Sequence, residues 1–363
     1  MEGFVLNSGI ETIVKGQSSR TTASRSLVVS SSGARVTSVD LSKCLQNERA
    51  RDARSVFPKA LGGKRFCTAV VWLRDELRLD DNVALDRAYG DATNLIVVVI
   101  YGHDRMHWRA ANFMRDSLSD LRESLRSQGS DLILRRGNPV EILPDFCKQT
   151  NAEALYYYRG NNQRKMKLAD DVGAKMEDLG VRCFYDFEDT LYDFKIIKLS
   201  VSELPEDCHA FTERMKDVEV PPPRERPKRI PPCPRNLDKG LLPETQDLAF
   251  PESNNKFSVR HIPTGGETTA LARLKQFVLG KTKKTPPEGG AQQDIEFGAF
   301  NAYIALGCIS PRRIYENVMK DVSKASMRRY CTCFDLQLAD FLTFLELKRL
   351  KHPKPLCASP APV

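Results

Sequence analysis

The middle of the chain carries five short strand-like runs of residues, and several of them are continuously apolar or β-branched rather than alternating. They cover residues 67–73, 94–101, 131–136, 153–158 and 181–187. Strands that helices cover on both faces have this continuous pattern, whereas strands with one face in water alternate between apolar and polar residues. Each run therefore predicts a buried strand.

The segments between these runs have the period of amphipathic helices. In one, Met114, Leu118, Leu121 and Leu125 recur at spacings of four, three and four residues and form one apolar stripe. Gly129 follows where this helix should stop. This alternation predicts an α/β fold with a doubly wound, parallel, five-stranded Rossmann-like sheet. Ligands of such sheets bind beyond the carboxyl ends of the strands, near the switch in strand order.

A second helical pattern follows Gly265 and Gly266. Three helices are predicted, and the middle one opens with the cap and proline of Ser310 and Pro311. The stripes of the other two consist of Ala270, Leu271, Leu274, Phe277 and Val278, and of Phe334, Leu338, Phe341, Leu342 and Leu345. We interpret these residues as the core of a small, incompletely covered helical part.

Changes in composition divide the chain into five regions. Residues 1–62 are rich in Ser, Thr and Arg and poor in acids, which is typical of an organelle transit peptide or of a disordered extension. Residues 63–190 hold the α/β pattern, and residues 191–262 form a connector with a proline-rich, basic middle. Residues 263–352 carry the helical pattern, and residues 353–363 form a tail.

Charge and cysteine content narrow the function classes. The net charge of +8 favours contact with phosphates without establishing it. No run of about 20 apolar residues exists, so we expect no membrane span. The ten cysteines include no C-x-x-C pair and the five histidines are scattered. We therefore expect no metal site, and reduced thiols in an intracellular compartment.

Three motifs then occur in an order known from one family. Residues 71–85, VWLRDELRLDDNVAL, resemble the W-F-R-x-D-L-R-x-x-D-N-x-A-L signature of photolyases and cryptochromes. Residues 265–274 resemble the G-G-E…A-L-x-R-L segment that opens the family's helical domain. Residues 305–315, ALGCISPRRIY, are similar to its L-A-x-G-C-I-S-P-R-x-I-Y stretch, most of all in the DASH-type cryptochromes. The resemblance extends over residues 66–345.

The polar residues of the first motif follow the first predicted strand. Arg74 and Arg78 should lie at the carboxyl edge of the sheet, where they can pair with carboxylates or with a ligand. Asp81 or Asn82 can cap the next helix. We favour architectural roles for these four residues. No phosphate loop or G-x-G-x-x-G motif is present, which argues against an unrelated adenine-nucleotide hydrolase.

The resemblance implies that the α/β domain holds an antenna chromophore, a folate or a flavin. In folate-binding members an Asn-Glu pair follows the fourth strand, and here the pair is Asn162 and Gln163. A glutamine both donates and accepts hydrogen bonds, so binding of methenyltetrahydrofolate would be weakened rather than abolished. A capped, solvated helix start is the alternative role of this pair.

By the same resemblance, photorepair needs FAD in the helical domain and a relay of tryptophans. The chain has two tryptophans, Trp72 and Trp108, both in the predicted α/β domain. Residues 297–305 lack the hydroxyls of the family's T/S-x-F-S-P-W-L-A segment. Residues 337–344 keep Asp340 but neither the tryptophan nor the arginines of L-W-R-D-F/Y-F-R-F. We expect a truncated, degenerate FAD-binding part, regard FAD as doubtful and assign no catalytic residue.

Three functions follow as hypotheses. The first is a DASH-like blue-light photoreceptor or DNA photolyase relative without autonomous photorepair, in a family whose enzymes are deoxyribodipyrimidine photo-lyases. The second is an active FAD-dependent pyrimidine dimer photolyase or blue-light receptor of which this chain is a shortened form. The third is a non-photochemical interaction module whose helical part a protein partner covers.

Two further expectations concern contacts and location. Contact with single-stranded DNA or RNA is predicted at Arg312, Arg313, Arg328 and Arg329, because they form two basic pairs. Residues 1–62 predict a plastid or a mitochondrion, with the cytoplasm or nucleus as the alternative.

Overall fold

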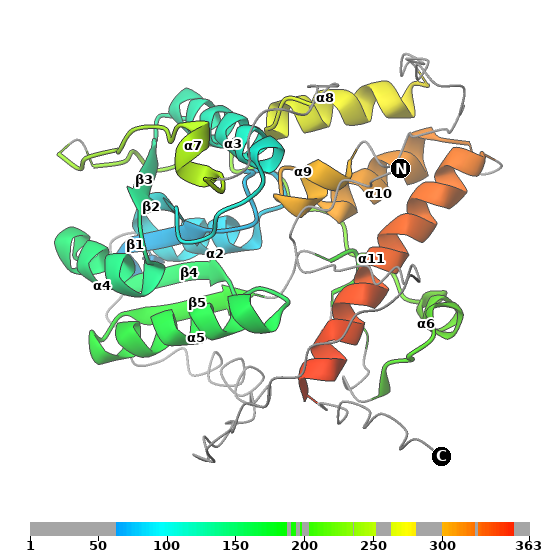
Figure 1. Ribbon diagram of the computed structural model, residues 1–363, viewed down its shortest axis with the longest axis horizontal. Helices are drawn as coiled ribbons and strands as arrows, with labels where there is room; N and C mark the ends of the chain where they lie inside the picture. The colour runs from blue at the N-terminus through cyan, green and yellow to red at the C-terminus, as the bar shows by residue number, and fades with distance from the viewer. Residues whose placement is uncertain are drawn as a thin grey trace, which may run out of the picture. The chain divides into compact units, whose positions relative to one another are not determined.

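The computed structural model describes residues 63–186, 190–193, 197, 203–234, 236–251, 263–280, 300–323 and 326–351. Its centre is a parallel sheet of five strands in the order β3-β2-β1-β4-β5 (Figure 1). The strands are β1 (Phe66–Leu73), β2 (Ala92–Tyr101), β3 (Leu132–Arg136), β4 (Ala154–Tyr158) and β5 (Arg182–Asp186). The predicted strands and the doubly wound α/β class are confirmed.

β1 lies in the middle of the sheet because its residues are apolar on both faces. Val70, Val71 and Trp72 pair with residues 96–98 of β2 on one side and with residues 155–157 of β4 on the other. Each of the three is at most 1% exposed. Removing such apolar surface from water stabilises the fold by about 25 cal/mol per Å².

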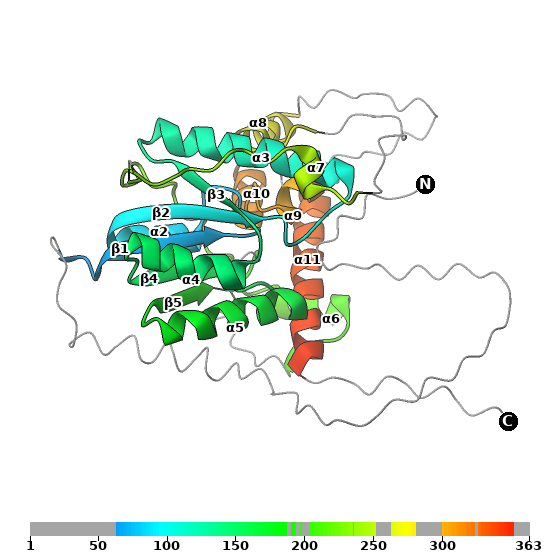
Figure 2. The same cartoon turned by 60° about the vertical axis from the view of Figure 1, so that its left-hand side comes forward.

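Helices cover both faces of the sheet (Figure 2). The helices are α2 (Val83–Asp91), α3 (Trp108–Ser127), α4 (Pro139–Thr150) and α5 (Gln163–Asp178). Right-handed crossovers carry α2 and α3 to one face while the chain moves outward to β3. They carry α4 and α5 to the other face when it returns through β4, and these two helices share one apolar core there.

The signals that begin and end these helices act as predicted. Asn82 caps α2, because its Oδ1 accepts a hydrogen bond from Leu85 N at 2.9 Å. Gly129 follows α3 with a φ of +87°, the left-handed backbone that glycine adopts most readily. The stripe from Met114 to Leu125 is buried.

The described part of the connector includes two short helices that the sequence pattern does not predict. They are α6 (Cys208–Met215) and α7 (Thr245–Leu248), and neither is long enough to display a clear apolar period. Its proline-rich middle, residues 221–230, has no helix or strand, as expected.

A later part of the connector lies along the free edge of β3. Leu134 N donates to Lys239 O at 2.9 Å, and Arg122 Nη2 donates to the carbonyl oxygens of Lys239 and Gly240 at 2.9 and 2.8 Å. A Cβ on Gly240 would lie 2.2 Å from Leu134 O, so only glycine permits this close approach. The connector thus covers backbone groups that an edge strand would leave unpaired.

The helical part contains α8 (Glu267–Val278), α9 (Asn301–Ala305), α10 (Pro311–Asp321) and α11 (Met327–Lys351). The three predicted helices correspond to α8, α10 and α11, and α9 is an additional short helix. Aromatic rings join this part to the rest, since Phe113 of α3 packs edge-on against Tyr303 with ring centres 5.0 Å apart. No helix in the described ranges is long and apolar enough to cross a membrane.

Candidate functional site

Segments that follow three strands meet at the carboxyl edge of the sheet, beside the switch in strand order. The chain leaves β1 toward β2 and β3 on one side and returns to β4 on the other, so the switch lies between β1 and β4. Asp75 follows β1, His103 and Asp104 follow β2, and Arg164 and Lys165 lie in the first turn of α5 after β4. Doubly wound sheets bind their ligands at this place.

The charged side chains at this edge form two ion pairs around a histidine. Lys165 Nζ lies 2.9 Å from Asp75 Oδ2, and Arg164 Nη2 pairs with Asp104 Oδ1. His103 Nε2 lies 3.7 Å from Asp104 Oδ2. Asp75 Oδ2, Asp104 Oδ1 and His103 Nδ1 are buried, yet within the described residues none makes an aligned hydrogen bond. The two carboxylate oxygens have only their ion-pair partners, and His103 Nδ1 has no partner among the described residues, so this edge can accept further donors from a ligand or a water molecule.

Burial and neighbouring charges set the protonation of this cluster. Burial is the main cause that lowers the pKa of His103; Arg74 and Arg164 act in the same direction, whereas Asp104 and Asp75 oppose it. Burial alone would raise the pKa of Asp75, but the cations Lys165 and Arg74 together hold it below its ordinary value. At neutral pH the edge therefore presents a neutral imidazole beside an ionised carboxylate.

Arg74 holds the end of β1 against the start of α5. Its guanidinium lies 4.7 Å from the ring centre of Trp72. Its Nη1 donates to the carbonyl oxygens of Tyr158, Arg159 and Lys165 at 3.1–3.2 Å. These contacts give Arg74 the architectural role that was favoured, and they fix the position of the charged cluster.

A glycine allows Lys165 to fold back toward Asp75. Gly160 has a φ of +93°, and a Cβ there would lie 2.4 Å from Lys165 Cβ. Any other residue would be strained by its backbone and would displace the first turn of α5. The glycine therefore positions one side of the cluster.

The predicted antenna residues lie at the same helix start. Asn162 Oδ1 accepts a hydrogen bond from Lys165 N at 2.9 Å and caps α5, and Gln163 is exposed. Asn162 thus performs the capping role that was the alternative reading of this pair. A role in folate binding stays a prediction.

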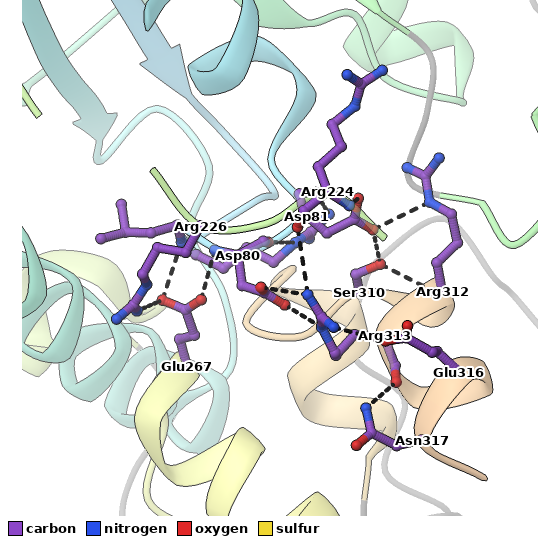
Figure 3. Close-up of polar contacts among 12 residues, drawn as sticks. Asp80, Asp81, Arg224, Arg226, Glu267, Ser310, Arg312, Arg313, Glu316 and Asn317 are labelled. Carbon is purple, nitrogen blue, oxygen red and sulfur yellow. Dashed lines mark hydrogen bonds and ion pairs between the residues drawn. The ribbon is translucent and has the colours of Figure 1, made fainter. Parts of the chain in front are cut away.

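A second polar network joins the loop after β1 to α10 (Figure 3). Asp80 accepts hydrogen bonds from Nε and Nη2 of Arg313 at 2.7 and 2.8 Å. Asp81 accepts from Ser310 Oγ and from Arg312 Nε, the latter at 3.1 Å. The signature motif of β1 therefore docks onto the start of α10 through two carboxylates.

The connector and α8 enter the same network (Figure 3). Glu267 accepts from the backbone N–H groups of residues 79 and 80 at 3.0 and 2.7 Å, and from Arg226 Nη2 at 2.5 Å. Arg224 N donates to Asp81 Oδ1 at 2.9 Å. Three segments far apart in the sequence thus converge on one acidic loop.

The four arginines predicted to contact nucleic acid all bond within the protein. Arg312 and Arg313 pair with the acidic loop, and the side chain of Arg312 is only 4% exposed. Arg328 and Arg329 donate to backbone carbonyl oxygens at the ends of α8 and α10. Two adjacent arginines in the sequence can therefore form hydrogen bonds within the protein and need not form a charged surface. Contact with nucleic acid through them stays a prediction.

The residues that resemble the family's flavin-binding segments serve in packing. Residues 297–299 lie outside the described residues, and Tyr303 is fully buried with its hydroxyl on a backbone carbonyl. Asp340 accepts from the backbone N–H groups of residues 191 and 192 at 2.9 and 2.8 Å. Gln337 donates to the hydroxyl of Tyr192 at 2.7 Å. Both tryptophans lie in the α/β part, on β1 and α3.

Comparisons of the sequence and of the fold with known proteins both find photolyases and cryptochromes. The family model described as DNA photolyase matches residues 69–228. A cryptochrome DASH of Gloeobacter violaceus is 30% identical over 305 residues, which cover 77% of this chain and 59% of that protein. A cryptochrome from Synechocystis sp. PCC6803 has the same fold with a TM-score of 0.66 and 27% identity, and the match covers 78% of this chain and 62% of that one. In sequence and in fold the chain is similar to photolyases and cryptochromes.

Two further proteins extend this similarity. The blue-light photoreceptor PHR2 of Arabidopsis thaliana is 27% identical over 294 residues, covering 75% of this chain and 65% of that protein. A bacterial class III photolyase from Agrobacterium tumefaciens, at 20% identity and a TM-score of 0.62, supports the fold alone. The chain spans 59–65% of the length of the curated relatives PHR2 and the Gloeobacter cryptochrome DASH.

Sequence reasoning missed the charged cluster at the carboxyl edge of the sheet. His103 and Asp104 were not singled out, nor was Lys165, because no motif of the resemblance contains them. The available signal was positional, since each residue lies a few positions after a strand at the carboxyl edge. Within the described ranges, no group of three His, Cys, Asp or Glu side chains is placed to hold a metal ion.

Proposed function

We propose that this chain is a DASH-like family member whose α/β domain binds a conjugated antenna ligand and which lacks FAD-dependent photorepair of its own. The observation that carries the proposal is the set of buried polar atoms on Asp75, His103 and Asp104 at the switch point, which make no aligned hydrogen bond within the described residues. Two carboxylates accept from N–H groups of a ligand, and Arg164 and Lys165 attract an anionic tail.

A folate has both features, since its pterin ring carries N–H donors and its tail is anionic. When bound, such a group would absorb light in the near ultraviolet. The chain's own residues would only bind and orient it. Asn162 and Gln163 support this assignment because they open the helix that carries Arg164 and Lys165.

The segments that correspond to the family's flavin-binding residues support the second half of the proposal, namely that this chain lacks FAD-dependent repair. A pyrophosphate needs cations, hydroxyls or free N–H groups. Neither residues 300–305 nor residues 337–344 contain a Lys or an Arg. The polar groups of Tyr303, Gln337 and Asp340 bond to other parts of the protein. These segments fit a packed core and do not fit FAD.

Binding of the two chromophores to the purified chain tests the proposal. We expect methenyltetrahydrofolate to be retained with a near-ultraviolet band in equilibrium dialysis, and FAD to be lost. Asp75→Asn should weaken folate binding at least tenfold, at about 1.4 kcal/mol for each factor of ten. Asp131→Asn is the matched control, because this carboxylate pairs with Arg126 just before β3, at the amino edge of the sheet. Stoichiometric, photoreducible FAD on this chain alone would refute the second half.

A working blue-light receptor or photolyase, of which this chain is a shortened form, is the alternative. It is favoured by the greater length of the relatives, one of which is named a blue-light photoreceptor. A longer product that binds FAD and repairs dimers in light would establish it. An interaction module without photochemistry is the third possibility, and a colourless protein that retains neither chromophore would support it.

We also propose import into an organelle. Two relatives, from Arabidopsis thaliana and Solanum lycopersicum, are named chloroplastic/mitochondrial. Residues 1–62, which lie outside the described residues, are rich in Ser and Arg and poor in acids. A fluorescent fusion of the whole chain should enter plastids or mitochondria, and a fusion without these residues should stay in the cytoplasm or nucleus.

A further inference from the structure

Helix α11 carries two sets of apolar residues. Its inner side is buried, and Phe341 and Phe344 pack against Phe211 of α6 with ring centres 5.6 and 5.9 Å apart. A second set, the outer stripe, recurs at spacings of four, three, four, four and three residues and therefore lies along one side of the helix. The outer stripe consists of Met327, Cys331, Phe334, Leu338, Leu342 and Leu345.

Most of the outer stripe is open to solvent in the described part of the chain, and Leu338 and Leu345 are half-buried. Met327 is 72% exposed, Phe334 39% and Leu342 37%. Tyr330, beside the stripe, is 68% exposed and stacks on Phe334. A helix that is apolar all round is normally buried, and contiguous exposed apolar surface marks an interaction site. From Met327 to Leu345 the stripe extends about 27 Å along α11.

The spacing of the outer stripe is symmetric about Leu338. Phe334 and Leu342 lie four residues before and after it, and Cys331 and Leu345 lie seven before and after it. A helix with this symmetry is complementary to a copy of itself that runs in the opposite direction. The small Cys331 would meet Leu345 of the second copy, and the large Phe334 would meet Leu342. Each contact would then pair a smaller side chain with a larger one, which favours close packing.

We propose that α11 docks antiparallel on α11 of a second copy of this chain, around a two-fold axis at Leu338. Such an interface is isologous, so each contact occurs twice. This proposal does not rest on the proposed function, because it involves neither the sheet edge nor a chromophore.

Charges at the ends of α11 complement this arrangement. Arg328 and Glu346 are 18 residues apart, about five helical turns, and so lie on the same flank at opposite ends. A two-fold axis brings Arg328 of each copy, which also donates to Phe277 O of its own chain, toward Glu346 of the other copy. The opposed helix dipoles add to the attraction. An arrangement with parallel helices would place like charges side by side.

Sedimentation equilibrium of the full chain tests the proposal. We expect a dimer whose mass falls twofold on dilution, and a monomer at every concentration for the double variant Phe334→Glu/Leu342→Glu. Leu241→Glu is the matched control, since Leu241 is 86% exposed and lies on the connector. Circular dichroism checks that the variants are folded. A wild-type chain that is monomeric throughout a micromolar series, or a dimer that survives the double variant, overturns the proposal.

A cross-link gives an independent test that does not depend on a destabilising change. Leu345→Cys places a cysteine opposite Cys331 of the second copy. Mild oxidation should then produce disulfide-linked dimers on a non-reducing gel, and Leu241→Cys should not. Equal dimer yields from both variants would overturn the arrangement. A monomeric chain that binds another helical protein through the outer stripe would also overturn it, because the occupant would not be a second copy.

Discussion

Asp81 is the residue on which the docking of the helical part depends most. It is fully buried, and its φ of +49° lies in the left-handed region, which Asp tolerates better than most residues. A buried carboxylate is costly unless donors surround it. Here the backbone N–H of Arg224, Ser310 Oγ and Arg312 Nε all donate to it. The acidic pair of the signature motif is therefore explained by the partners it binds.

Arg312→Ala should be strongly destabilising because it leaves Asp81 buried without its cation. We expect the free energy of unfolding to fall by about 3–5 kcal/mol in urea titrations. Arg136→Ala is the control, since the Arg136–Asp247 pair is exposed and worth under about 1 kcal/mol. Similar losses from both variants would mean that the Asp81 network does not hold the fold.

His103 predicts a dependence of stability on pH. Its pKa is lowered in the folded state, mainly by burial, so the unfolded chain binds the proton first as the pH falls. Stability should therefore be complete above about pH 6.5 and decrease as the pH falls through that value toward the lowered folded-state pKa. His103→Gln should flatten this part of the melting temperature profile between pH 5 and 8. A profile identical to that of the wild type would show that His103 is solvated.

The start of α5 is the element that brings the candidate site together. Gly160→Ala should cost about 1–2 kcal/mol for the left-handed backbone and about 1–3 kcal/mol more for the contact with Lys165 Cβ. Gly180→Ala should show the backbone cost alone, because Gly180 also has a positive φ but nothing lies within 4 Å of its Cβ position. Thermal unfolding compares the two variants. Equal losses would show that Lys165 moves away freely.

Elements with a long apolar period could be predicted from the sequence, and short polar ones could not. Strands β1 and β2 follow from continuous apolar runs, the other strands follow from shorter apolar or aromatic runs, and α3 follows from one stripe. The helices α7 and α9 span four and five residues and carry no measurable period. The cluster around His103 was missed for a different reason, because its members come from three segments that only the strand order brings together. Asn162 was found, since a helix cap is a local signal.

In the molecule as a whole, the α/β part and the helical part meet through backbone as well as charge. Leu77 N donates to Leu306 O at 3.3 Å, and Arg78, which is fully buried, donates to Gly307 O at 2.9 Å. The loop after β1 thus contacts the α9–α10 turn directly. A periodic pattern of apolar residues cannot predict a contact between residues that are more than 200 positions apart in the sequence. The resemblance indicated that both motifs exist, but the structure explains why they occur together.

Gly307 is the tightest point of this joint and gives a test at the scale of the whole molecule. Its φ is +59°, and a Cβ there would lie 1.7 Å from Asp75 O, so Gly307→Ala must separate the two parts. We expect hydrogen exchange to rise at least tenfold in α8 and α10, while β1, β2 and β4 keep their protection because their core is independent of the joint. Gly63→Ala, at a positive φ with open space around it, should leave both parts protected. Equal loss of protection in the sheet would mean that the two parts unfold as one cooperative unit, and that the α/β part cannot hold its ligand site without the helices docked on it.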